Sequence, residues 1–109
     1  KLKYGILNFK KLSEYDDNFT KFVSMLPDYY NRLKDAGYES LGNELLEFAV
    51  EQGADSKNVY ILLANAFISM SKADRLAELI EKAKQLNSLS KDGIVSMLES
   101  LQADAATDR

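Results

Sequence analysis

The stretch that decides the fold is ELLEFAVEQGADSKN, from Glu44 to Asn58, because the chain repeats it as ELIEKAKQLNSLSKD, from Glu78 to Asp92. The offset between the two stretches is 34 residues. Identical pairs occur at Glu44/Glu78, Leu45/Leu79, Glu47/Glu81, Ala49/Ala83, Ser56/Ser90 and Lys57/Lys91, and Gly53/Asn87 keeps its chemical type. Since these identities stay in register along the whole stretch, we interpret it as one structural unit that has been copied.

Apolar residues recur every three or four positions along most of the chain, which is the spacing of one face of an α-helix. The 109 residues include five glycines and one proline, so few positions interrupt such helices. The pattern predicts an all-α chain of about six to seven helices. The expected helices cover residues 2–13, 19–26, 27–36, 41–53, 59–70, 76–86 and 94–101.

Helix boundaries are predicted from proline, glycine and serine. Pro27 is expected to begin a new helix, because a proline inside a helix costs about 3 kcal/mol whereas its missing N–H is harmless at the first helical position. Gly53 is expected to end its helix in the left-handed conformation. The expected N-caps are Ser40, Ser71 and Ser90, with Asp74 completing a weak capping box with Ser71.

The central helix reads Tyr60-x2-Leu63-Ala64-x2-Phe67, and Ile80 and Ala83 follow in the next helix. This arrangement resembles the tetratricopeptide repeat, whose first helix reads W-x2-L-G-x2-Y and whose period is 34 residues. The resemblance is best over residues 56–87. Residues 27–53 resemble a degenerate copy, in which Tyr30 and Leu33 align with Tyr60 and Leu63 and the small Gly42 lies where the helices cross.

The resemblance implies a single helical domain over residues 1–103, in which antiparallel hairpins stack as a short right-handed superhelix. Residues 91–103 are then the helix that caps the array, since an uncovered hairpin leaves an apolar face in water, and residues 104–109 are a flexible tail. Antiparallel helices approach closely only where small side chains meet. The expected crossing points are Gly42, Ala49, Ala66 and Ala83.

The composition excludes most catalytic chemistries. The sequence has no histidine and no cysteine, which removes Ser-His-Asp and Cys-His arrangements, the usual zinc ligands and disulfides. We therefore expect no enzymatic activity and no cofactor. The net charge of −3 disfavours nucleic acid as a partner. No apolar run approaches the roughly 20 residues of a membrane span and no signal peptide is visible, so we expect a soluble, cytoplasmic protein.

Glutamates recur on the polar side of the two copied helices, at Glu44, Glu47 and Glu51 and again at Glu78 and Glu81. Paired carboxylates can perform acid–base catalysis or bind calcium. These glutamates stand opposite the apolar faces and lack a glycine-rich loop, so we interpret them as a solvated helix face.

In the family that the chain resembles, the first helix of each hairpin lines a concave surface that holds another polypeptide. The resemblance therefore implies a protein or peptide partner. The implied contact residues are Asn31, Arg32 and Asp35 in the first unit and Asn58, Ile61, Leu62, Asn65 and Ser69 in the second. Asn65 is the leading candidate, because a carboxamide can donate to and accept from a peptide backbone.

Two other functions remain open at the level of the sequence. The spacing Tyr60-x2-Leu63-x3-Phe67 also resembles the RNA-binding pentatricopeptide family, although the net charge speaks against RNA. Alternatively, the chain is a segment of a longer solenoid or associates with itself, since two hairpins fall short of the three repeats usually needed for stability.

Overall fold

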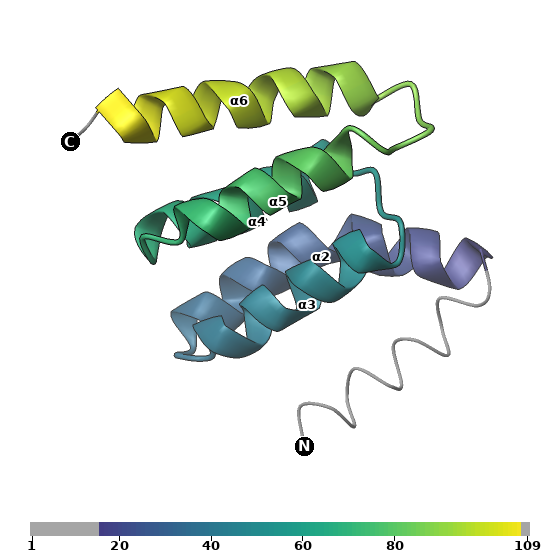
Figure 1. Ribbon diagram of the computed structural model, residues 1–109. Helices are drawn as coiled ribbons and strands as arrows, with labels where there is room; N and C mark the ends of the chain where they lie inside the picture. The colour runs from purple at the N-terminus through teal and green to yellow at the C-terminus, as the bar shows by residue number, and fades with distance from the viewer. Residues whose placement is uncertain (1–15, 108–109) are drawn as a thin grey trace. The chain divides into compact units, whose positions relative to one another are not determined.

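The computed structural model describes residues 16–107, and these residues form five α-helices without a β-strand (Figure 1). The helices are α2 (Asp16–Asp35), α3 (Glu39–Glu51), α4 (Lys57–Ser69), α5 (Ala73–Ala83) and α6 (Lys91–Thr107). The prediction of an all-α chain is thus confirmed. The helix expected over residues 2–13 lies outside the described residues.

The chain divides into two compact units, the first ending at Ala54 and the second beginning at Asp55. In the first unit, α2 and α3 pack as an antiparallel hairpin (Figure 1). The rings of Phe22 and Phe48 meet edge to face with their centroids 6.3 Å apart. Tyr30 is buried, and its hydroxyl donates to Asn43 Oδ1 at 3.0 Å. These contacts join the two helices of the hairpin along their length.

In the second unit, α4 and α5 form an antiparallel hairpin and α6 packs against both of its helices (Figure 1). Each helix buries the residues that recur every three or four positions, which is why the periodicity predicted the core. The ammonium of Lys84, the C-cap residue of α5, lies 3.9 Å from the carboxylate of Glu99 on α6. The buried residues are Val59, Tyr60, Leu63, Ala64, Ala66 and Phe67 of α4, Leu76, Leu79, Ile80 and Ala83 of α5, and Ile94 and Leu98 of α6.

The predicted helix boundary at Pro27 is wrong, because α2 continues through this proline without a break. Proline lacks an N–H, so the carbonyl of Val23, four residues earlier, receives no helical hydrogen bond from it. Phe22, Leu26 and Tyr30 are all buried and lie four residues apart on one face of α2. Burial of such side chains contributes about 1.5–3 kcal/mol each, which together exceeds the cost of the proline. A new helix at Pro27 would move Tyr30 off this face.

Three helices end in the same left-handed geometry, and a serine occupies one of the three left-handed positions. These positions are Gly37 (φ 92°), Gly53 (φ 98°) and Ser71 (φ 58°). At the end of α4, the N–H of Ser71 donates to the carbonyl of Ile68 at 3.0 Å and the N–H of Lys72 donates to the carbonyl of Phe67 at 2.8 Å. This pair of bonds defines a Schellman motif.

The N-caps expected at Ser40 and Ser71 are therefore wrong. α3 begins one residue before Ser40, with Tyr38 as its N-cap, and α5 begins after Lys72, and neither N-cap residue makes a side-chain capping bond. Ser71 ends α4 instead of starting α5. A serine in a short interhelical turn can end the preceding helix or cap the following one. The left-handed backbone at residue 71 shows that Ser71 ends the preceding helix.

Replacing Ser71 by glycine should raise the free energy of unfolding by about 0.5–1 kcal/mol, because a side chain in the left-handed region is strained and glycine is not. Gly37→Ala and Gly53→Ala are matched controls: a Cβ at either glycine would meet no atom within 4 Å, so any loss comes from the backbone alone. Both controls should lose stability. Urea denaturation followed by circular dichroism measures all three changes, and a destabilised Ser71→Gly variant would contradict the expectation.

The two copies of the repeated stretch end their helices differently. Gly53 is left-handed, whereas Asn87 at the equivalent position is not, and α5 ends in short turns with Gln85 N–H bonded to the Lys82 carbonyl at 3.1 Å. Ser56 caps α4 as its Oγ accepts from the Val59 N–H at 3.3 Å. Ser90 was the expected cap of α6. Its backbone N–H donates to Ser88 Oγ at 3.0 Å.

The last helix extends beyond its expected end at Ala103, because α6 runs to Thr107. The hydroxyl of Thr107 donates to the Ala103 carbonyl at 2.6 Å, which is a side-chain bond back to the preceding turn of the helix. The alanines of this segment favour helix strongly. Residues 103–107 therefore add a helical turn to the second unit.

Candidate functional site

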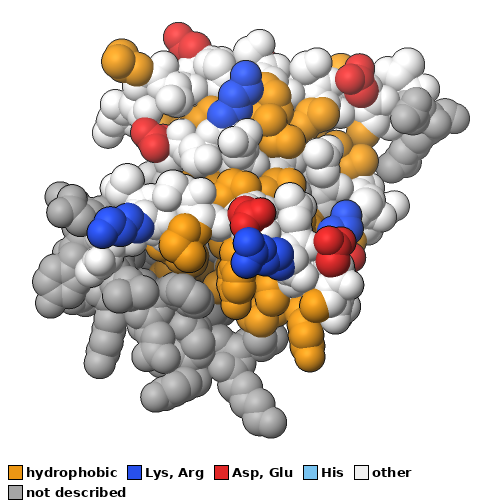
Figure 2. Space-filling view, turned by 180° about the vertical axis from the view of Figure 1, so that it is seen from behind, with side chains coloured by type: hydrophobic (Ala, Val, Ile, Leu, Met, Phe, Trp, Pro, Cys, Tyr) orange, Lys and Arg blue, Asp and Glu red, His pale blue; other side chains and the backbone are white. Residues whose placement is uncertain are grey.

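Five of the predicted contact residues form one stripe along α4, because they follow the helical spacing from Asn58 to Ser69. Asn58, Asn65 and Ser69 are exposed, while Ile61 and Leu62 between them are half-buried. We call these five residues the α4 stripe. Figure 2 shows the molecule from the side on which α4 lies in front of α5, and hydrophobic side chains are visible between α6 and the helix below it.

The two carboxamides of the α4 stripe make no hydrogen bond to the described residues. Within the described part of the chain, neither the Asn58 nor the Asn65 side chain has a hydrogen-bond partner. The hydroxyl of Ser69 donates to the carbonyl of Ala66 at 3.1 Å, so its proton is already engaged. Asn58 and Asn65 can therefore donate to and accept from a partner on either side of an apolar patch.

The three predicted contact residues of the first unit lie near the end of α2. Asn31, Arg32 and Asp35 are exposed. The guanidinium of Arg32 is 3.1 Å from the Asp28 carboxylate, and the two side chains are 77% and 74% exposed. An ion pair so open to water contributes little to stability, so Arg32 can exchange Asp28 for another carboxylate at small cost.

An apolar groove of about 460 Å³ opens in the second unit, between the turn that joins α4 to α5 and the last turns of α6. We call it the α4–α6 groove. Leu76 is buried at its edge, and Ile68 is half-buried. The α6 side of the groove carries Gln102, Ala105 and Ala106. Since these two alanines contribute only a methyl group each, α6 cannot fill the space beside the hairpin.

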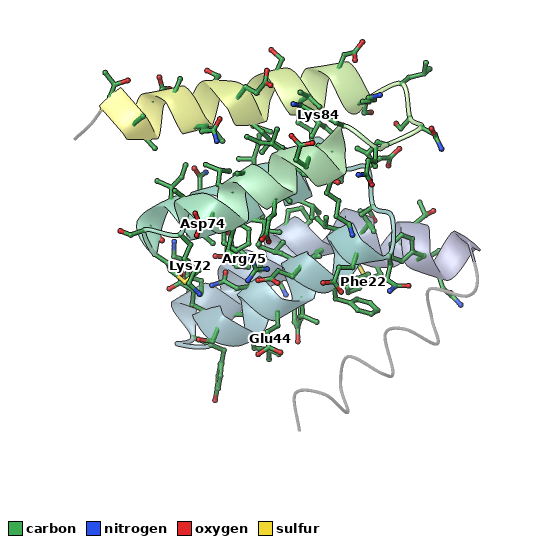
Figure 3. All side chains as sticks on the ribbon, in the orientation of Figure 1. Phe22, Glu44, Lys72, Asp74, Arg75 and Lys84 are labelled. Carbon is green, nitrogen blue, oxygen red and sulfur yellow. The ribbon has the colours of Figure 1, made fainter. Side chains whose placement is uncertain are left out.

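Among the described residues that line this groove, Lys72 is the one that is charged. It lies at the turn between α4 and α5 (Figure 3). Among the described residues its ammonium forms no ion pair. The neighbouring cation is engaged, since Arg75 is 3.3 Å from the Glu78 carboxylate and lies 5.0 Å from the centre of the Phe67 ring.

The sequence did not predict the α4–α6 groove, because residues 104–109 were assigned to a flexible tail. The groove forms because α6 extends beyond the predicted end of this helix. The alanine-rich composition of residues 103–106 was the available signal, since alanine has the highest helix propensity.

The acidic residues lie on helix surfaces. Glu44 and Glu47 are half-buried and Glu51 is exposed on α3; Figure 3 labels Glu44 on this helix. Glu81 is 3.4 Å from the Lys84 ammonium. Over residues 16–107 the structure contains no group of three side chains that could hold a metal ion.

Tyr60 is fully buried, and no group within the described structure makes a hydrogen bond to its hydroxyl. Burial, and secondarily the negative charge of Asp55, raises the pKa of Tyr60 to about 12. Burial also raises the pKa of Tyr30, with a further contribution from Glu39. Both hydroxyls thus stay protonated at neutral pH, and we assign both tyrosines to packing.

The chain matches no protein-family model, none of the curated proteins and no solved structure with which it was compared. Within residues 16–107, no helix is both long and apolar enough to cross a membrane.

Proposed function

We propose that this chain is a protein-interaction module of the tetratricopeptide-like type, which binds a peptide segment of a partner protein and catalyses no reaction. The observation that carries the proposal is the α4 stripe. Asn58 and Asn65, whose carboxamides make no hydrogen bond within residues 16–107, lie on either side of the half-buried Ile61 and Leu62. A peptide in extended conformation offers alternating backbone donors and acceptors for the carboxamides, while its apolar side chains cover the aliphatic residues.

Two further features support the proposal. The boundary between the compact units, at Ala54 and Asp55, falls in the break between the two proposed repeats, which supports the proposal. The absence of histidine and cysteine from the sequence leaves few side chains for catalysis but places no limit on binding. On this proposal, Asn31, Arg32 and Asp35 are contact residues of the first hairpin.

Selection of displayed random peptides on the immobilised full chain tests this function. We expect peptides to be enriched and Asn65→Ala to weaken their binding roughly threefold to tenfold, the effect of one lost hydrogen bond. Asn58→Ala should act in the same direction. Asn87→Ala, which removes an exposed carboxamide outside the α4 stripe, is the matched control and should leave the dissociation constant unchanged.

The proposed function would be rejected if no peptide were enriched over the starting library. If peptides bind but Asn58→Ala, Asn65→Ala and Arg32→Ala all leave affinity unchanged, the contact residues are wrong. Circular dichroism of every variant separates a lost contact from a lost fold.

A further inference from the structure

The α4–α6 groove is suited to an aliphatic side chain from outside the chain. Its volume of about 460 Å³ falls within the range of roughly 300–1,000 Å³ that is usual for ligand sites. Its apolar boundaries are Ile68 and Leu76 on the hairpin and Ala105 and Ala106 on α6. Transfer of an aliphatic side chain from water into such surroundings is favourable by the hydrophobic effect.

The groove continues the surface of the α4 stripe. Ile68 follows Asn65 by three residues, so the two lie on adjoining turns of one helix face. An extended peptide that bonds to Asn65 would reach the groove within a few residues, since each residue spans about 3.3 Å. The groove and the α4 stripe can therefore accept neighbouring residues of one partner.

The charge at the groove selects a negative partner. Among the described residues that line the groove, Lys72 is the one charged side chain, and within residues 16–107 it has no ion-pair partner. Asp74 lies in the first turn of α5 and already complements the positive end of the helix dipole, so the attraction for an anion comes from Lys72. The net charge of the chain is −3, so the attraction for an acidic segment is local to Lys72.

We propose that the α4–α6 groove binds an acidic peptide segment of a partner protein, in which an aliphatic side chain lies in the groove and an adjacent aspartate or glutamate pairs with Lys72. This inference rests on the proposed function and adds to it the chemical class of the partner. It also assigns to α6 a part in binding, in addition to its packing against the hairpin.

The test uses the enriched peptides of the selection, synthesised as C-terminal amides so that their only carboxylates are side chains. Fluorescence anisotropy measures their dissociation constants. Lys72→Glu should weaken binding about fivefold to tenfold, because it turns an attraction into a repulsion. Ala105→Leu should weaken binding about tenfold or more by filling the groove. The matched controls are Lys82→Glu on α5 and Ala103→Leu on α6, which make the same changes outside the groove lining, and neither should change the affinity.

The outcomes separate this inference from the function on which it rests. Enriched peptides that carry an aliphatic residue beside an acid, and that lose affinity when the acid is changed to its amide, support it. Peptides that depend on Asn65 but tolerate Lys72→Glu and Ala105→Leu overturn the inference and leave the proposed function standing. Absence of any enriched peptide overturns both. A dimer in light scattering that Ala105→Leu dissociates would make a second copy the occupant and also overturn the inference.

Discussion

Replacing Tyr60 by alanine should lower the free energy of unfolding by about 3–5 kcal/mol, the usual cost of removing a buried aromatic ring. The side chain is 0% exposed and lies in the core of the second unit. A loss of this size is a large share of the roughly 5–15 kcal/mol that holds a small domain together. Urea denaturation measures it, and a loss below about 1 kcal/mol would show that the ring is not part of the core.

Tyr60→Phe is the matched control, because it keeps the ring and removes only the hydroxyl. That hydroxyl is buried without a hydrogen-bond partner in the described structure, and such a group costs about 1–3 kcal/mol. Tyr60→Phe should therefore be as stable as the parent chain or more stable. Tyr30→Phe should instead lose about 1 kcal/mol, since the Tyr30 hydroxyl is bonded to Asn43. Equal losses from both substitutions would contradict the burial of an unpaired hydroxyl at Tyr60.

The same pair of tyrosines gives a second measurement at alkaline pH. The pKa of Tyr60 is raised from 10.0 to about 12 in the folded chain, so above pH 10 the unfolded chain releases a proton that the folded chain keeps. The contribution of Tyr60 to stability is constant below about pH 10 and should fall by about 1.4 kcal/mol per pH unit up to about pH 12. Tyr60→Phe should remove this share of the pH dependence, whereas the share that comes from Tyr30 should remain.

The core was predictable from the sequence because burial follows the helical period. Leu45, Phe48 and Ala49 share one face of α3 by their spacing in the sequence, and all three are buried. The same holds for Leu79 and Ile80 on α5. In each case the physical cause acts over a few residues, since a helix presents every third or fourth side chain to the same neighbour. Local periodicity therefore predicts which residues pack.

The helix boundaries were less predictable because tertiary packing decides them. Pro27 is a helix breaker by local propensity, yet α2 passes through it because Leu26 and Tyr30 are buried on one face. Serine is a residue type that is common at N-caps, yet Ser71 ends α4 in the left-handed conformation. Neither outcome follows from the residue itself, since each depends on the direction that the following helix must take.

The candidate site, like the fold, was predictable from the sequence only in part. The family resemblance implied that Asn58 and Asn65 face a partner, and both residues are exposed. The α4–α6 groove was not predicted, because it depends on the length of α6 and on the small volume of Ala105 and Ala106 beside Leu76. Sequence patterns indicate which side chains point outward, whereas a groove is a space between elements that are distant in the chain.

Gly42→Ala should lower the free energy of unfolding by about 1–3 kcal/mol, although alanine favours helix by about 1 kcal/mol over glycine. The crossing of α2 and α3 was predicted at this glycine, and a Cβ added there would lie 2.7 Å from Cδ1 of Tyr30. The ring cannot easily withdraw, since it is buried and its hydroxyl is bonded to Asn43. Overpacking against a fixed ring therefore outweighs the gain in helix propensity.

Gly93→Ala separates the two effects, because a Cβ on this glycine of α6 would meet no atom within 4 Å. It should gain roughly 0.5 kcal/mol from helix propensity alone. Combining Gly42→Ala with Tyr30→Ala removes the ring that the new methyl group strikes. The double variant should then lose at least about 1 kcal/mol less than the sum of the two single losses, since residues in direct contact are not additive. If Gly42→Ala instead gains stability as Gly93→Ala does, α2 and α3 do not cross closely at Gly42, and the glycine has no packing role in the first hairpin.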